Sequence, residues 1–242
     1  LTNTTGSGLV AIGNRSLQEN TTGGSNVAAG SNSLRNNTTA SGNTAFGGES
    51  LRANTTGANN VGIGLSALNV NTTASQNTAV GMSALLSNTT GANNTATGTY
   101  AMRANTTGAQ NTAFGTESLK ETTTGENNTC TGYSALIANT TGIQNHGFGV
   151  QAGGSITSGD NNVCVGYQAG HYGTPITTGS ENVMLGNYCK PSAEAGDFQF
   201  AAGFNVACTG DNNFTFGNAA TDSNIAFGAT TITAPSDERY KE

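Results

Sequence analysis

The sequence has no tryptophan, few charged residues, few prolines and no long apolar run. Only 9% of its 242 residues are charged, against about a quarter in an average globular domain. A disordered chain of similarly low hydrophobicity normally carries a high net charge or much proline. This chain has a formal net charge of −6 and three prolines, so the composition fits neither class.

The same scarcities argue against two kinds of partner. No apolar run approaches the roughly 18 residues that a membrane-spanning helix needs. Eight Lys and Arg residues stand against 14 Asp and Glu residues, and they form no basic cluster of the kind that nucleic-acid phosphates require. We therefore expect no membrane insertion and no nucleic-acid partner. With 34% hydrophobic residues, we expect stability to come from repetition and hydrogen bonding, not from one large core.

The chain is instead rich in Asn, Thr and Gly, and these residues follow a 17-residue repeat. If the Asn of the triplet N-T-T is position 1, the consensus is N-T-T-G-x-x-N-T-A-[FVI]-G-x-x-[SA]-L-x-x. The repeat keeps its phase over ten units, from Asn3 to about Gly170. Position 7 is Asn in every unit after the first, at Asn26, Asn43, Asn60, Asn77, Asn94, Asn111, Asn128, Asn145 and Asn162. Position 11 is always Gly, as at Gly47, Gly64, Gly81 and Gly115.

This unit predicts an all-β fold, a parallel β-solenoid (β-roll) with one 17-residue coil per repeat. Asn, Thr and Gly are poor helix formers, and positions 7 to 10 alternate like a short strand that ends at a glycine. Stacked coils lie about 4.8 Å apart, so Asn side chains can hydrogen-bond along the axis and position 11 can take a positive φ. Like charges stacked at that spacing would repel, which explains why charge is rare.

Position 9 is always Ala, Gly or Cys, and by the period of two it points away from positions 8 and 10. We expect the position 10 residues Phe46, Ile63, Val80, Phe114 and Phe148 to fill the coil interior together with the Leu residues of position 15. The small residues at position 9 would then lie against the backbone of a neighbouring subunit. Because one thin coil buries little apolar surface alone, the pattern predicts a homo-oligomer.

The motifs N-T-A-F-G (43 to 47 and 111 to 115) and N-T-A-V-G (77 to 81) resemble repeats in the heads of trimeric autotransporter adhesins, whose repeats are shorter. The 17-residue form resembles more closely the repeats of bacteriophage tail fibres and related fibre-domain proteins. Near the C-terminus, S-D-E-R-Y-K (236 to 241) resembles the start of the endosialidase-type intramolecular chaperone, which trimerises fibre proteins and then cuts itself off. The resemblance implies Ser236 and Asp237 as the scissile pair of a downstream chaperone.

Taken together, these resemblances imply a homotrimer, intertwined or side by side, in an extracellular virion tail fibre that attaches a phage to its host cell. They imply three segments: a regular shaft over residues 1–170, modified C-terminal coils or an irregular β tip over residues 171–235, and the start of a chaperone domain or a tail over residues 236–242. A bacterial trimeric adhesin head on the cell surface is the first alternative.

The expected tip begins where the repeat phase slips by three residues, after Gly170, and it holds six of the nine Phe residues. One interpretation is a cap that covers the last coil. The other is a surface that binds a host glycan or protein, since Tyr and His on irregular loops can stack on sugars. The candidate residues for this binding are Tyr167, His171, Tyr172 and Tyr188.

We expect no cofactor, no metal site and no catalytic residue in this segment. Cys130 and Cys164 share position 9 two coils apart, about 9.6 Å, which is too far for a disulfide. A bridge between Cys189 and Cys208 stays open, with reduced thiols as the default expectation. The two histidines show no metal-ligand spacing.

Two further functions remain as alternatives. Thr at positions 2 and 3 suggests an ice-binding solenoid, although adjacent side chains point to opposite faces and leave one rank per coil outward. A tip depolymerase would need Asp197, Asp211 or Asp222 to converge as a carboxylate pair.

Overall fold

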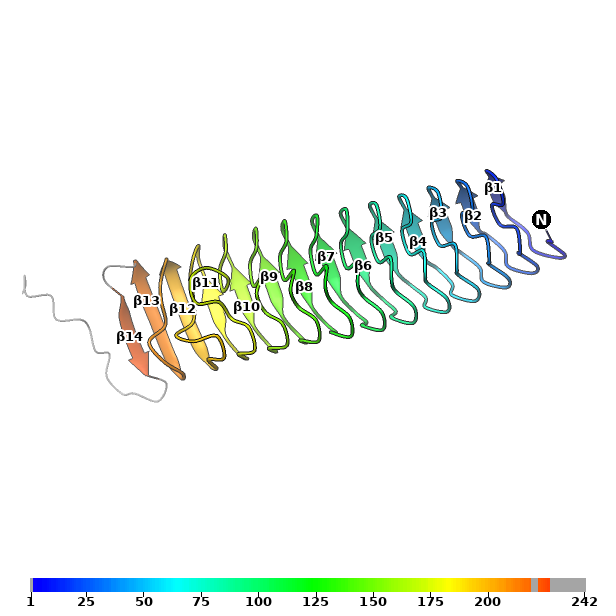
Figure 1. The fold of residues 1–242 in the computed structure, drawn as a ribbon. Helices are drawn as coiled ribbons and strands as arrows, with labels where there is room; N and C mark the ends of the chain where they lie inside the picture. Colours follow the sequence, from blue (N-terminus) through cyan, green and yellow to red (C-terminus); the bar gives the residue numbers. More distant parts are fainter. Residues whose placement is uncertain (1, 219–221, 227–242) are drawn as a thin grey trace, which may run out of the picture.

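A computed structural model describes residues 2–218 and 222–226 of the chain. They form one 14-stranded sheet whose strands lie in sequence order, each coil stacked on the one before (Figure 1). The strands are β1 (Val10–Ile12), β2 (Val27–Ala29), β3 (Thr44–Phe46), β4 (Val61–Ile63), β5 (Thr78–Val80), β6 (Thr95–Thr97), β7 (Thr112–Phe114), β8 (Thr129–Thr131), β9 (His146–Phe148), β10 (Val163–Val165), β11 (Val183–Leu185), β12 (Gln199–Phe204), β13 (Asn213–Asn218) and β14 (Ser223–Ala226). The expected parallel β-solenoid is confirmed.

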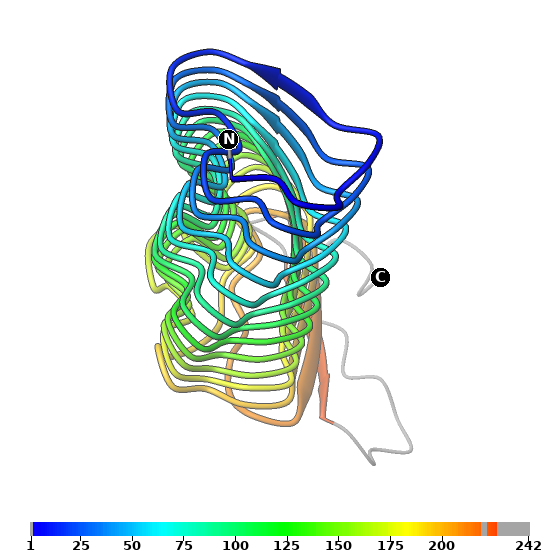
Figure 2. The same cartoon turned by 90° about the vertical axis from the view of Figure 1, so that its right-hand side faces the viewer.

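Strand register follows the repeat directly. Thr44 of β3 pairs with Val61 of β4, 17 residues on, and the nine pairings between β1 and β10 all keep this offset. Seen from the N-terminal end, successive coils repeat one outline, each displaced a little from the one before (Figure 2). Thirteen parallel strands at the usual spacing make a stack about 58 Å long.

The register changes only near the C-terminal end. Val163 pairs with Val183, an offset of 20, because an insertion lengthens this coil. The next offset is 17 again, and Gln199 then pairs with Asn213, an offset of 14. Finally β14 runs antiparallel to β13, which ends the parallel stacking.

The coil interior contradicts one of our expectations. Position 9, not position 10, points inward: Ala45 and Ala113 are 0% exposed, whereas Phe46 and Phe114 are 47% and 44% exposed. Ile63 and Phe148 are likewise exposed, and Val80 is half-buried. The alternation along the strand was correct, but the inner and outer sides were assigned the wrong way round.

The physical reason is the narrowness of the coil. At Gly62, which occupies position 9 in β4, an added Cβ would lie 2.6 Å from Ser50 Oγ and 3.3 Å from Leu51 Cγ. Position 9 thus packs directly against positions 14 and 15 of the preceding coil. Position 9 is therefore occupied by Ala, Gly or Cys, and in β11 by the flexible side chain of Met184. A Phe side chain has no room there.

The Leu column at position 15 does fill the interior, as we expected. Its members are fully buried at Leu17, Leu34, Leu51, Leu68, Leu85, Met102, Leu119 and Leu136. In the next two coils position 15 is Gly153 and Gly170, and Ile156 and Ile176 at position 1 of the following coils are buried instead. A Cβ on Gly153 would lie 3.0 Å from Ile156 Cδ1, so the loss of one side chain and the gain of another keep the interior filled.

Two columns of buried Asn run along the axis. At position 7, Asn60 donates its backbone N–H to Asn43 Oδ1 (2.9 Å) and its side-chain amide to Ala74 O (2.9 Å). At position 1, Asn88 donates Nδ2 to Asn71 Oδ1 (2.9 Å) and to Gly91 O (2.9 Å). Each of these bonds contributes about 0.5–1.5 kcal/mol net, and together they replace the large apolar core that the composition cannot supply.

Candidate functional site

The outer side of the sheet is formed by positions 8 and 10 of β1–β11 and their equivalents in β12 and β13. We call it the outer face. Its residues are Val10, Ile12, Val27, Ala29, Thr44, Phe46, Val61, Ile63, Thr78, Val80, Thr95, Thr97, Thr112, Phe114, Thr129, Thr131, His146, Phe148, Val163, Val165, Val183, Leu185, Phe200, Ala202, Phe214 and Phe216. None of these is Asp, Glu, Lys or Arg. The outer face is therefore an apolar and Thr-lined strip along the whole stack.

The size of this strip is in the range of the largest exposed patch on a typical monomer. Two residue columns about 7 Å apart over about 58 Å cover roughly 400 Å² in plan. Exposed apolar patches of this size on a monomer are commonly functional. Several of its largest side chains, including Ile12, Phe46 and Phe148, are more than 40% exposed.

A second feature is an aromatic cluster around Tyr188. The structure brings together three of the four predicted binding residues: the ring centroid of Tyr188 lies 5.3 Å from that of Tyr167 and 4.9 Å from that of Tyr172. Phe204 is a fourth member at 5.8 Å. All three pairs are edge-to-face, the arrangement that the ring quadrupole favours. Tyr167, Tyr172 and Phe204 stay substantially exposed.

We missed Phe204 in the sequence, although a signal was present. Phe204 follows Gly203 as Tyr167 follows Gly166, so each comes directly after the glycine at position 11 of its coil. Numbering the modified coils from that glycine would have placed the two residues in one column. Lys190 and Asn205, which border the cluster, were also missed.

His171, the fourth predicted binding residue, is not among the rings that pack on Tyr188. Its Nδ1 lies 2.8 Å from Ser155 Oγ, and burial lowers the pKa of its imidazole. A Cβ on Gly154 would lie 3.2 Å from the same nitrogen. His171 thus fastens the start of the insertion to the preceding coil.

The four cysteines are free and buried. Burial raises the pKa of the Cys130, Cys164 and Cys208 thiols to about 12, so these groups stay protonated and unreactive at neutral pH. Across residues 2–218 and 222–226, no group of three or more His, Cys, Asp and Glu side chains is placed to hold a metal ion.

The acidic residues considered for a carboxylate pair bind backbone groups. Asp197 Oδ1 accepts a hydrogen bond from Ser180 N at 2.6 Å, and Asp211 Oδ1 accepts one from Asp197 N at 3.0 Å. Asp222 Oδ2 accepts a longer one from Ala207 N at 3.4 Å. These contacts join successive coils. The other predicted pair, Ser236 and Asp237, lies outside the described residues.

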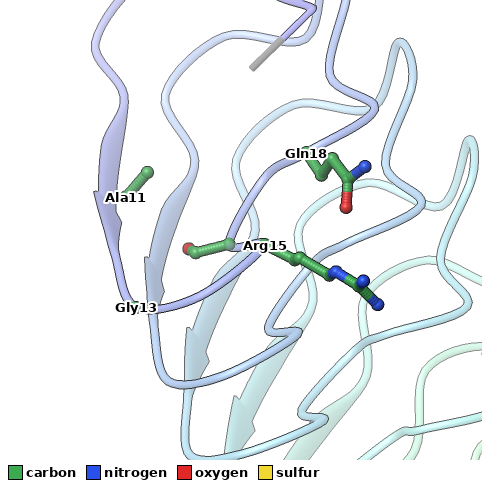
Figure 3. A pocket seen from close by; sticks show the side chains of 5 residues that line it. Ala11, Gly13, Arg15 and Gln18 are labelled. Carbon is green, nitrogen blue, oxygen red and sulfur yellow. The ribbon is translucent and has the colours of Figure 1, made fainter.

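A concavity of about 410 Å³ lies at the first coil, lined by Ala11, Gly13, Arg15, Ser16 and Gln18 (Figure 3). Ala11 occupies position 9 and is exposed here, whereas the equivalent Ala28 is buried. The difference arises because no described coil covers β1. The hollow is the uncovered end of a coil, and we assign no ligand to it.

The fold therefore defines a class, the parallel β-solenoids, and the surface features above define two candidate sites on it. The chain matches no protein-family model, and comparisons with curated proteins and with solved structures give no significant match. Within the described residues, no helix is long and apolar enough to span a membrane.

Proposed function

We propose that this chain is a shaft-and-tip segment of a self-associating adhesive fibre, of the kind found in phage tail fibres that attach to a host cell surface. The outer face carries this proposal. A long strip of apolar and Thr side chains without Asp, Glu, Lys or Arg favours association with another surface of the same kind, and a second copy of the chain offers a strip of the same length and repeat.

Repetition makes self-association particularly favourable. Since every coil places the same two positions on the outer face, two copies aligned along their axes can repeat one contact at each coil. Like charges along such a contact would repel across the whole length, and the outer face has none. The resemblance to trimeric fibre proteins supports three copies, so that each strip would contact two others.

The outer face also bears on the ice-binding alternative. Among the strands that the structure describes, T-x-T side chains occur only in β6 (Thr95 and Thr97) and β8 (Thr129 and Thr131). Phe46, Phe114 and Phe148 interrupt the rank in other coils. Moreover, position 2 Thr hydroxyls donate to the next coil, as Thr55 Oγ1 does to Thr72 O at 3.0 Å. These features favour the fibre proposal over the ice-binding alternative.

The test is the solution mass of the full chain by light scattering coupled to size exclusion. We expect a species of about three times the chain mass of 24.2 kDa. The double variant Phe46→Glu and Phe114→Glu introduces charge into the outer face and is expected to give a folded monomer, which circular dichroism would verify.

A matched control places the same two charges elsewhere. Thr56 and Thr107 are exposed at position 3, so Thr56→Glu with Thr107→Glu should leave the mass of the assembly unchanged. A folded monomer for the unmodified chain at micromolar concentration would overturn the proposal. An assembly that persists in the Phe46→Glu and Phe114→Glu double variant would also overturn the proposal.

A further inference from the structure

The insertion that shifts the repeat contributes to a cleft beside it. Its cavity of about 190 Å³ is lined by Tyr172, Tyr188, Phe204 and Asn205. Tyr172 comes from the insertion itself, while Tyr188 and the pair Phe204 and Asn205 come from the two coils that follow. Three successive segments therefore contribute to one site.

The rings in this cleft are positioned by one another. Tyr188 is at the centre, with the Tyr172 ring inclined to it by 66° and the Phe204 ring by 90°. The outer rings remain about half exposed, Tyr172 at 48% and Phe204 at 52%. Fixed and partly exposed aromatic faces are suited to stacking against the C–H face of a sugar ring.

Polar groups converge on the same cleft. Lys190 Nζ lies 5.6 Å from the centroid of the Tyr172 ring and 3.4 Å from Asn205 Oδ1. Among the described residues, the ion pairs are those of Arg52 and Lys120, and Lys190 has no acidic partner. An ammonium group held beside apolar rings without a counter-ion attracts an anion.

We infer that this cleft binds one acidic sugar residue, a pyranose that bears a carboxylate. The sugar ring stacks on Tyr172 and Phe204, Asn205 hydrogen-bonds its hydroxyl groups, and its carboxylate pairs with Lys190. The cavity is smaller than the roughly 300–1,000 Å³ of sites for drug-sized ligands, so it takes a single residue of a glycan. This inference deepens the proposed attachment function and rests on it for its biological role.

The experiment titrates the full chain with glucuronate and, separately, with glucose, and follows binding by ligand-observed NMR. The two sugars differ in the charged group at C6. We expect glucuronate to bind at least tenfold more tightly than glucose, and its affinity to fall as salt is added. Equal affinity for the two sugars would overturn the role of Lys190, and no binding of either would overturn the site.

Variants separate the two contributions. Lys190→Gln should reduce the affinity for glucuronate at least tenfold, to the level of glucose, and Tyr172→Ala should weaken both sugars. Tyr133→Ala is the control, since Tyr133 is similarly exposed at 52% on a regular coil, and it should change neither. A Lys190→Gln variant that keeps full glucuronate affinity contradicts the inference.

Failure here and failure of the proposed fibre are distinguishable. A trimeric chain that binds neither sugar would leave the self-association proposal intact and overturn the cleft assignment. A monomeric chain that binds glucuronate through Lys190 would overturn the self-association proposal and leave the cleft assignment intact.

Discussion

Thr122 occupies position 1 of the coil that follows the coil of Asn105. Because Thr122 has no side-chain amide, Asn105 Oδ1 receives no hydrogen bond. Asn105 Oδ1, Thr122 Oγ1 and Asn139 Oδ1 are all buried, and none has a hydrogen-bond partner among the described residues. From Asn20 to Asn105, by contrast, each amide donates to the Asn one coil before it. Thr122 thus leaves Asn105 Oδ1 and its own Oγ1 unsatisfied, and Ile156, one coil beyond Asn139, leaves Asn139 Oδ1 without a donor.

Restoring Asn should repair the column. Thr122→Asn supplies an amide that can donate to Asn105 Oδ1 and an oxygen that can accept from Asn139. Since an unsatisfied buried polar group costs about 1–3 kcal/mol, we expect the free energy of unfolding to rise by about that amount in urea denaturation. The reverse change, Asn88→Thr, should lower it by a similar amount. A Thr122→Asn variant no more stable than the parent would show that the gap in the column costs nothing.

Adjacent glycines Gly47 and Gly48 are predicted to differ sharply. Gly47 has a φ of 124°, and an added Cβ would lie 2.5 Å from Gly64 O, a backbone atom that cannot move aside. A Cβ on Gly48 would meet Leu65 Cδ1 at 3.4 Å and Ser31 O at 3.9 Å, both ordinary contacts. We expect Gly47→Ala to lower the free energy of unfolding by at least about 2 kcal/mol.

Gly48→Ala is the control, and it should change the same quantity by less than about 0.5 kcal/mol. Thermal denaturation of the two variants side by side measures the difference. Equal effects would mean that the strand-end turn tolerates a side chain.

The solenoid was predictable because its signal recurs: the 17-residue period, the short strand before Gly47 and its equivalents, and the Asn columns all follow from spacing. Which side of each strand faces the interior was not predictable. Phe46 and Ala45 alternate in either arrangement, and only the packing of Ser50 and Leu51 against position 9 decides which one points inward. The sequence period predicts that side chains alternate between the two sides of the strand, whereas the width of the coil determines which side faces the interior.

Backbone conformation was also beyond the sequence pattern. The position 15 Leu residues take a left-handed conformation, for example φ 50° at Leu51 and 49° at Leu119. This conformation costs an ordinary residue about 1–2 kcal/mol, and burying a Leu side chain returns about 1.5–3 kcal/mol. A sequence rule that reserves positive φ for glycine therefore misses them. In the aromatic cluster, Tyr172 was a candidate because it lies at the insertion. Lys190, whose Nζ lies 5.6 Å from the Tyr172 ring centroid, carries no repeat signal that would have placed it there.

The inner and outer sides of β7 should respond differently to substitution. Ala113→Leu adds volume to the closed interior and should destabilise the chain by about 1–3 kcal/mol at any protein concentration. Phe114→Thr leaves the coil intact, since Thr97 and Thr131 occupy the same position in the coils on either side. We expect its effect to appear only through association.

Denaturation at several protein concentrations separates these effects, because stability that depends on association varies with concentration. At the lowest concentrations, Phe114→Thr should match the parent chain within about 0.5 kcal/mol. A concentration-independent loss for Phe114→Thr would indicate that Phe114 supports the coil itself.

The buried thiols predict how stability changes at high pH. Burial raises the pKa of Cys130 from 9.0 to about 12, while in the unfolded chain the thiol ionises near 9.0. Below pH 9 both states hold the proton, so the thiol does not alter the pH dependence. Between pH 9 and 12 the unfolded state loses its proton first, and the free energy of unfolding should fall by about 1.4 kcal/mol per pH unit for this group.

Cys130→Ala isolates this contribution, because Ala113 and other residues at position 9 show that Ala fits the site. Tyr and Lys titrate alike in the parent and the variant, so they cancel in the difference. In urea denaturation with reductant, the variant should gain about 2–3 kcal/mol over the parent between pH 9 and 11, relative to their difference at pH 7. A difference that stays constant across this range would mean that Cys130 ionises as readily in the folded coil as in the unfolded chain, and hence that the interior at position 9 admits water.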